Sequence, residues 1–124
     1  SITAEQVQLG LEAAERNLQL AIELNKPPLP LSRAYWMLAA QEMAARQYAQ
    51  AQEHFALAEQ AALGTDSTAE QLLSRGFIQV AGLLADPDDP ALAGKLNEVR
   101  EALQEKENGE IFIQQMDDAL RVFG

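Results

Sequence analysis

The chain has 124 residues, enough for one domain with its own core but too few for two ordinary domains, so we expect residues 1–124 to form a single domain. Its 19 acidic and 9 basic side chains give a net charge of −10, which disfavours nucleic acid and anionic membrane surfaces as partners. The absence of cysteine excludes disulfides, thiolate catalysis and cysteine-bound metals.

The composition favours helices throughout. Alanine, leucine, glutamine and glutamate dominate, aromatic residues reach only 6%, and β-branched residues are few. The apolar runs are far shorter than the roughly 20 residues that span a bilayer, so we expect no membrane insertion. We therefore predict an all-α fold, a compact and soluble bundle of about five to six helices.

The first predicted helix opens at a capping box formed by Thr3 and Gln6. It ends near Asn25, before the proline-rich residues 26–30. One apolar stripe follows helical spacing and a second stripe lies beside it, which predicts packing against two neighbours or a subunit interface. The two stripes consist of Val7, Leu11, Ala14, Leu18, Ala21 and Ile22, and of Leu9, Leu20 and Leu24.

The second and third predicted helices form a hairpin. Ser32 is the expected N-cap of the second helix, and a break is predicted near Arg46 and Gln47. The third helix runs from about residue 49 to 63, and Gly64 is predicted to close it in a left-handed turn. The inner face expected for the second helix consists of Tyr35, Leu38, Ala39, Met43 and Tyr48.

Three more helices are predicted after this hairpin. Ser67 and Glu70 form a second capping-box pattern that opens the fourth helix. Asp89 and Pro90 suit the N-cap and the first position of the fifth helix, which is expected to stop near Asn108. The inner face of the last helix carries Ile113, Met116, Leu120 and Phe123.

A short pattern of small and large apolar residues occurs twice, 37 residues apart. Its copies are Ala14, Leu18 and Ala21, and Ala51, Phe55 and Ala58. With Tyr35 and Tyr48, the second copy makes residues 33–63 resemble a tetratricopeptide hairpin, although the signature glycine and the closing proline of that family are missing. The resemblance implies an αα-hairpin in the N-terminal half.

A second resemblance covers about residues 14–64. The sequence Pro-Leu-Pro-Leu at residues 28–31, followed by Arg33 and Ala34, precedes an alanine-rich helix and the segments at residues 57–59 and 63–64. This arrangement resembles the C-terminal half of YfdX-type bacterial proteins, whose N-terminal half has no counterpart here. The resemblance implies a periplasmic or secreted protein linked to stress, with no catalytic motif to carry over. A cytoplasmic protein is the alternative.

No residue pattern in the sequence indicates a reaction, a metal site or a cofactor site, so we expect a non-enzymatic protein. His54 is the only histidine and lacks the spacing of metal-binding or catalytic motifs, so we interpret it as a polar position beside the packed stripe. The clustered Asp86, Asp88 and Asp89 fail the calcium-loop pattern, because two prolines interrupt it and no central glycine is present.

The remaining candidate site is a group of aromatic and methionine residues after the proline turn: Tyr35, Trp36, Met37, Met43 and Tyr48. Residues 35, 36 and 37 point in three directions around a helix, so they cannot all face one core. Trp36 is then left for a second surface that contacts a partner, or it packs beneath the fourth or sixth helix.

Two classes of function follow. The first is a helical interaction or adaptor module that binds a protein or peptide or associates with itself as a homodimer. The second is a stress-related protein that binds a small ligand or a metal, through the acidic C-terminal third or through a cavity between helices.

Overall fold

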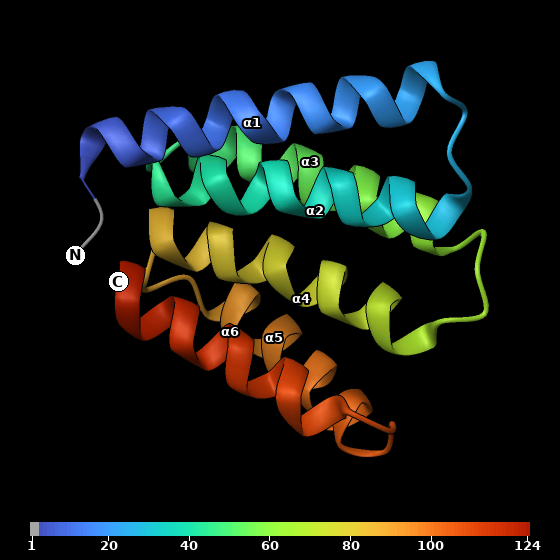
Figure 1. Ribbon diagram of the computed structural model, residues 1–124. Helices are drawn as coiled ribbons and strands as arrows, with labels where there is room; N and C mark the ends of the chain where they lie inside the picture. Colours follow the sequence, from blue (N-terminus) through green and yellow to red (C-terminus); the bar gives the residue numbers. More distant parts are fainter. Residues whose placement is uncertain (1–2) are drawn as a thin grey trace.

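The computed structural model describes residues 3–124, and this part of the chain contains six helices and no strand, which confirms the all-α prediction (Figure 1). No helix within it is long and apolar enough to cross a membrane. The helices are α1 (Ala4–Glu23), α2 (Pro28–Ala44), α3 (Tyr48–Ala62), α4 (Thr68–Ala85), α5 (Pro90–Gln104) and α6 (Gly109–Phe123).

The helices pack mainly in chain order, and α4 lies at the centre. Helix α1 packs on α2, α2 on α3, and α3 on α4, whereas α4 also contacts both α5 and α6. Figure 1 shows α1 at one edge of this stack and α6 with α5 at the other. The arrangement leaves α2 and α6 on either side of α4.

Two hydrophobic clusters hold the helices together. The larger one extends from α2 to α6, and its largest fully buried side chains are Phe55, Val80, Leu96, Leu103 and Met116. The smaller one lies between α1 and α2 and consists of Leu11, Ala14, Leu18, Ala21, Ala34 and Leu38. Both copies of the repeated Ala/Leu/Phe pattern are buried. Their small alanines let neighbouring helices approach closely.

The starts of α1 and α5 agree with the sequence patterns. The Thr3 hydroxyl oxygen accepts the Gln6 N–H at 3.1 Å, and the Thr3 N–H donates to the Gln6 side chain at 2.9 Å, so the capping box is confirmed. The Asp89 carboxylate caps α5 by accepting the N–H groups of Ala91 and Leu92, at 2.9 and 3.3 Å.

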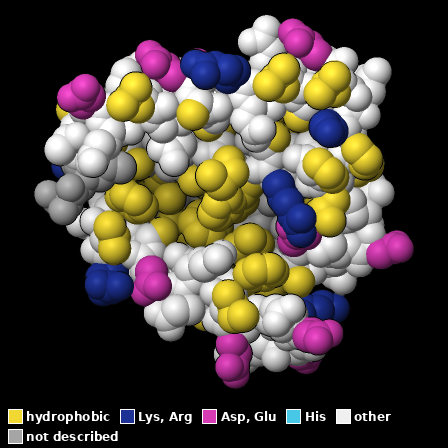
Figure 2. All heavy atoms as spheres, viewed as in Figure 1, with side chains coloured by type: hydrophobic (Ala, Val, Ile, Leu, Met, Phe, Trp, Pro, Cys, Tyr) yellow, Lys and Arg dark blue, Asp and Glu magenta, His cyan; other side chains and the backbone are white. Residues whose placement is uncertain are grey.

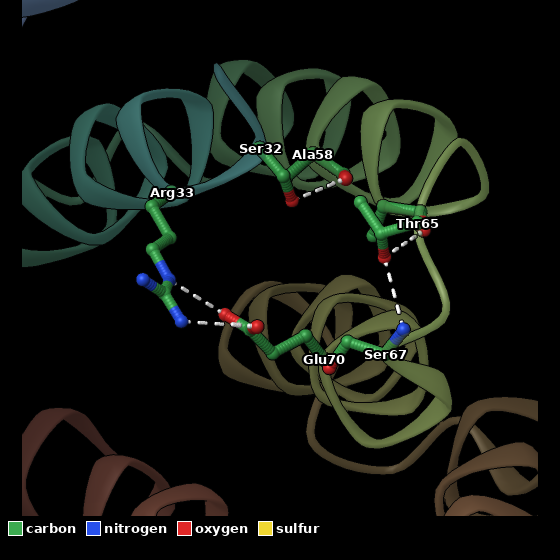
Figure 3. Close-up of polar contacts among 7 residues, drawn as sticks. Ser32, Arg33, Ala58, Thr65, Ser67 and Glu70 are labelled. Atoms are coloured by element: carbon green, nitrogen blue, oxygen red, sulfur yellow. Dashed lines mark hydrogen bonds and ion pairs between the residues drawn. The ribbon is translucent and has the colours of Figure 1, made fainter. Parts of the chain in front are cut away.

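The start of α2 differs from the prediction. The helix begins at Pro28, four residues before the expected N-cap, because prolines in a first helical turn remove only N–H groups that have no partner inside the helix. Ser32 is consequently an internal residue. Its buried hydroxyl donates to the carbonyl oxygen of Ala58 on α3 at 2.7 Å and joins the two helices (Figure 3).

The predicted capping box of α4 is also wrong. Ser67 stands at the N-cap position, but its side chain makes no capping hydrogen bond. Glu70 points instead to α2, where it accepts two hydrogen bonds from Arg33, and the Ser67 N–H donates to the Thr65 hydroxyl at 3.1 Å (Figure 3). The charged guanidinium of Arg33 is a stronger hydrogen-bond donor than the backbone N–H of Ser67. The Glu70 carboxylate therefore binds Arg33 and does not complete the capping box.

The left-handed turn predicted at Gly64 does not form either. No glycine within residues 3–124 has a positive φ, and the three residues that do are Asn25, Arg46 and Asn108. A Cβ atom at Gly64 would lie only 3.3 Å from the ring of Pro28. The chain after α3 passes close to the start of α2, and a glycine at position 64 leaves room for this contact.

Candidate functional site

A groove with an apolar lining runs between α2 and α6, with α4 as its floor. It comprises two neighbouring cavities of about 320 and 470 Å³ that share Trp36 and Gln115. Figure 2 shows hydrophobic side chains gathered in a hollow at the centre of this face. We call this feature the α2–α6 groove; its apolar lining residues are Trp36, Met37, Ala40, Met43, Ala44, Leu73, Phe77, Phe112, Ala119, Val122 and Phe123.

Trp36 occupies the middle of the groove. Its ring packs edge-on against Phe55 and Phe77, with ring centroids 5.9 and 5.2 Å apart, and it remains half-buried. The indole N–H is buried without a hydrogen-bond partner among the described residues, an arrangement that generally costs about 1–3 kcal/mol. Trp36 therefore packs on α3 and α4 and still presents part of its ring to the groove.

The five residues singled out in the sequence lie in different places. Trp36 and Met37 line the α2–α6 groove, and Met37 is 46% exposed. Met43 is only 2% exposed and belongs to the larger core cluster, although it also borders the groove. Tyr48 lies at the end of the groove, in an adjoining hollow, whereas Tyr35 packs in the smaller cluster near α1.

The second wall of the groove was missed in the sequence. Phe112 and Val122 both line it from α6, and Val122 is 62% exposed. The helical spacing of α6 correctly indicated its inward face, which includes Met116 at 0% exposure. The spacing of apolar residues along α6 indicates only which of its faces is buried. It does not indicate that α2, which is remote in the chain, lies across the groove from α6.

Charged pairs flank the groove. At one end Arg33 donates to both carboxylate oxygens of Glu70, at 2.9 and 3.2 Å, and this contact raises the pKa of the guanidinium. On α6 the Asp118 carboxylate accepts from Gln114 at 2.8 Å and from Arg121 at 3.2 Å. The hydrogen bond from Gln114, followed by that from Arg121, lowers the pKa of Asp118.

A second polar feature lies away from the groove, where α2 meets α3. The Nδ1 atom of His54 lies 2.6 Å from a carboxylate oxygen of Glu42, which is only 5% exposed, and Tyr35 stacks on the imidazole at 6.3 Å. Burial raises the pKa of Glu42, and the hydrogen bond with His54 opposes this effect. The sequence interpretation of His54 missed this partner, because Glu42 lies on another helix.

Metal chemistry gains no support from this pair. Within residues 3–124, no group of three histidine, aspartate or glutamate side chains is placed to hold a metal ion. Glu42 and His54 are best explained as a hydrogen-bonded pair that joins α2 to α3, since a buried carboxylate needs a partner.

Comparisons with protein-family models, with curated proteins and with solved structures find no match to this chain. Its function must therefore be inferred from the geometry of the chain itself.

Proposed function

We propose that the protein is a non-enzymatic interaction module that binds a protein or peptide partner in the α2–α6 groove. The observation that carries the proposal is the contiguous apolar surface in the groove, which includes the exposed side chains of Met37 and Val122. Contiguous exposed apolar surface on a small protein generally marks a binding site.

The composition of the groove supports this function. Trp36 offers part of a large, rigid ring that is already fixed by Phe55 and Phe77, so little side-chain freedom remains to be lost when a partner binds. Tryptophan is also among the residues that contribute most to protein–protein binding energy. Met37 can adjust its shape to the partner, since methionine side chains are flexible and polarizable.

Site-specific crosslinking in cells of the source organism tests the proposal. A photo-reactive amino acid at position 37 or 122 should form an adduct with one defined protein. The same amino acid at position 111 should not, because Ile111 is 57% exposed on α6 but does not line the groove. Adducts that are equally frequent at all three positions, or absent from both groove positions, would contradict a partner in the groove.

A small apolar ligand is the second candidate, because the two cavities fall within the volume range of ordinary ligand sites. A thermal-shift screen with apolar ligands and divalent cations separates this function from the first. A bound ligand raises the melting temperature as its concentration rises, whereas a flat screen would eliminate this candidate.

A further inference from the structure

We propose that the occupant of the α2–α6 groove is one amphipathic helix of a partner protein, with an apolar face toward Trp36 and a basic outer face. The inference rests on the proposed function and specifies the shape and charge of the partner. Its three supports are the length of the groove, the separation of its walls and the distribution of charge around it.

The length of the groove suits a short helix. Its lining residues extend along α2 from Ser32 to Ala44 and along α6 from Phe112 to Phe123. At a rise of 1.5 Å per residue, these walls are about 17–18 Å long. A helix of about 12 residues, or three turns, has this length. Its residues at positions i, i+3, i+4 and i+7 would present one apolar face to the groove.

The two walls of the groove are not packed closely on each other. Helices α2 and α6 are not among the closely packed pairs of the described chain, and neither are α2 and α4. The two walls are held apart by their contacts with other helices, α2 by α1 and α3, and α6 by α4 and α5. An added helix could then contact both walls and the α4 floor without displacing an existing helix.

The charge around the groove selects a basic partner. The three helices that form the groove, α2, α4 and α6, carry five carboxylates, three arginines and no lysine. Among the residues that line the groove, the carboxylates are Glu70 and Asp118 and the one base is Arg33, and Arg46 lines the adjoining hollow. All three of these helix arginines, Arg33, Arg75 and Arg121, are already paired with carboxylates. A second copy of the chain would bring another charge of −10, so lysine or arginine on the partner helix gives the better complementarity.

Designed peptides provide a direct test, because Trp36 is the only tryptophan and its fluorescence reports on the groove itself. Three peptides of about 15 residues share one leucine face. The first has a lysine polar face, the second has glutamate in place of lysine, and the third is the lysine peptide with a central proline that breaks the helix. We expect the first to shift the Trp36 emission and to bind at least about tenfold more tightly than the others.

A matched pair of variants distinguishes docking from general attraction between opposite charges. Val122→Glu and Ile111→Glu each add one negative charge to an exposed position of α6, and only Val122 lines the groove. We expect Val122→Glu to weaken the lysine peptide about tenfold despite its added charge, and Ile111→Glu to leave binding unchanged or slightly tighter. Equal effects of the two variants would overturn docking of the peptide in the groove.

The outcomes also separate this inference from the proposed function. Equal or tighter binding of the glutamate peptide, or of the proline peptide, would overturn the basic helix and leave the groove as a binding site. Failure of the lysine peptide to shift the Trp36 emission, while crosslinking at positions 37 and 122 still captures a partner, would likewise overturn only the inference. Absence of those crosslinks would overturn the proposed function.

Discussion

At the scale of single residues, Trp36 combines strong ring packing with an indole N–H that has no hydrogen-bond partner among the described residues. Trp36→Phe keeps an aromatic ring against Phe55 and Phe77 and removes the buried N–H, so we expect the free energy of unfolding to change by no more than about 1 kcal/mol. Trp36→Ala removes the ring and should cost about 3 kcal/mol. Urea unfolding followed by circular dichroism at 222 nm measures both, and a loss for Trp36→Phe as large as that for Trp36→Ala would show that the N–H has a partner in solution.

Glu42 gives the protein a pH dependence with a definite sign. Burial raises its folded-state pKa above the ordinary value, so its protonated form favours folding. This contribution is fully present below the ordinary glutamate pKa and is lost as the pH rises through the higher folded-state pKa. Glu42→Gln keeps the shape and cannot ionise, and we expect it to be more stable than the parent at pH 8 and about equally stable near pH 4.

Denaturant unfolding at several pH values tests this expectation, with Glu53→Gln as the control. Glu53 precedes His54 in the chain and is exposed, so its substitution removes the same charge without the burial. A Glu42→Gln variant that is less stable than the parent at pH 8 would show that the contact with His54 outweighs the cost of burying the carboxylate.

At the scale of helices, two glycines distinguish close packing from helix propensity. A Cβ atom at Gly76 on α4 would overlap the Met116 sulfur and lie 3.1 Å from Val99 Cγ1, whereas a Cβ atom at Gly94 on α5 would meet no atom of the described residues within 4 Å. We expect Gly76→Ala to destabilise the protein by about 1–2 kcal/mol, because Met116 is fully buried and cannot easily move.

Gly94→Ala should instead stabilise it by about 0.5–1 kcal/mol through helix propensity alone. Thermal unfolding of both variants gives the comparison. Stabilisation by Gly76→Ala would mean that α6 is able to move away from α4, because helix propensity would then exceed the steric cost.

The sequence predicted these helices well where a single residue and its close neighbours decide the outcome. Thr3 and Asp89 cap as expected because their partners lie two or three residues away. Ser32 departs from the prediction because α2 begins at Pro28 and places it inside the helix, whereas Glu70 departs because its partner is 37 residues away in the chain. A tertiary contact of this kind leaves no local pattern, so it could not be predicted.

The same reasoning applies to the candidate site. Trp36 could be identified because three large side chains in succession cannot all face one core. The groove itself could not be predicted, since it depends on α6 facing α2 across α4. The two family resemblances stay predictions.

At the scale of the whole molecule, the net charge of −10 opposes folding through repulsion among the carboxylates. Added salt screens this repulsion, and we expect the melting temperature to rise by several degrees between low salt and about 0.3 M sodium chloride. Calorimetry or circular dichroism measures the change. A melting temperature that falls over this range would mean that surface pairs such as Arg33 and Glu70 contribute more than the net repulsion.

The packing of the helices in chain order has a consequence for how the protein folds. Five of the six closely packed helix pairs in the described chain join consecutive helices, and the exception is α4 with α6. Contacts between neighbours require little loop closure, so the protein should fold in milliseconds or faster. Helix α1 packs closely only on α2, so it is the helix that can join last, or detach first, without opening the larger cluster.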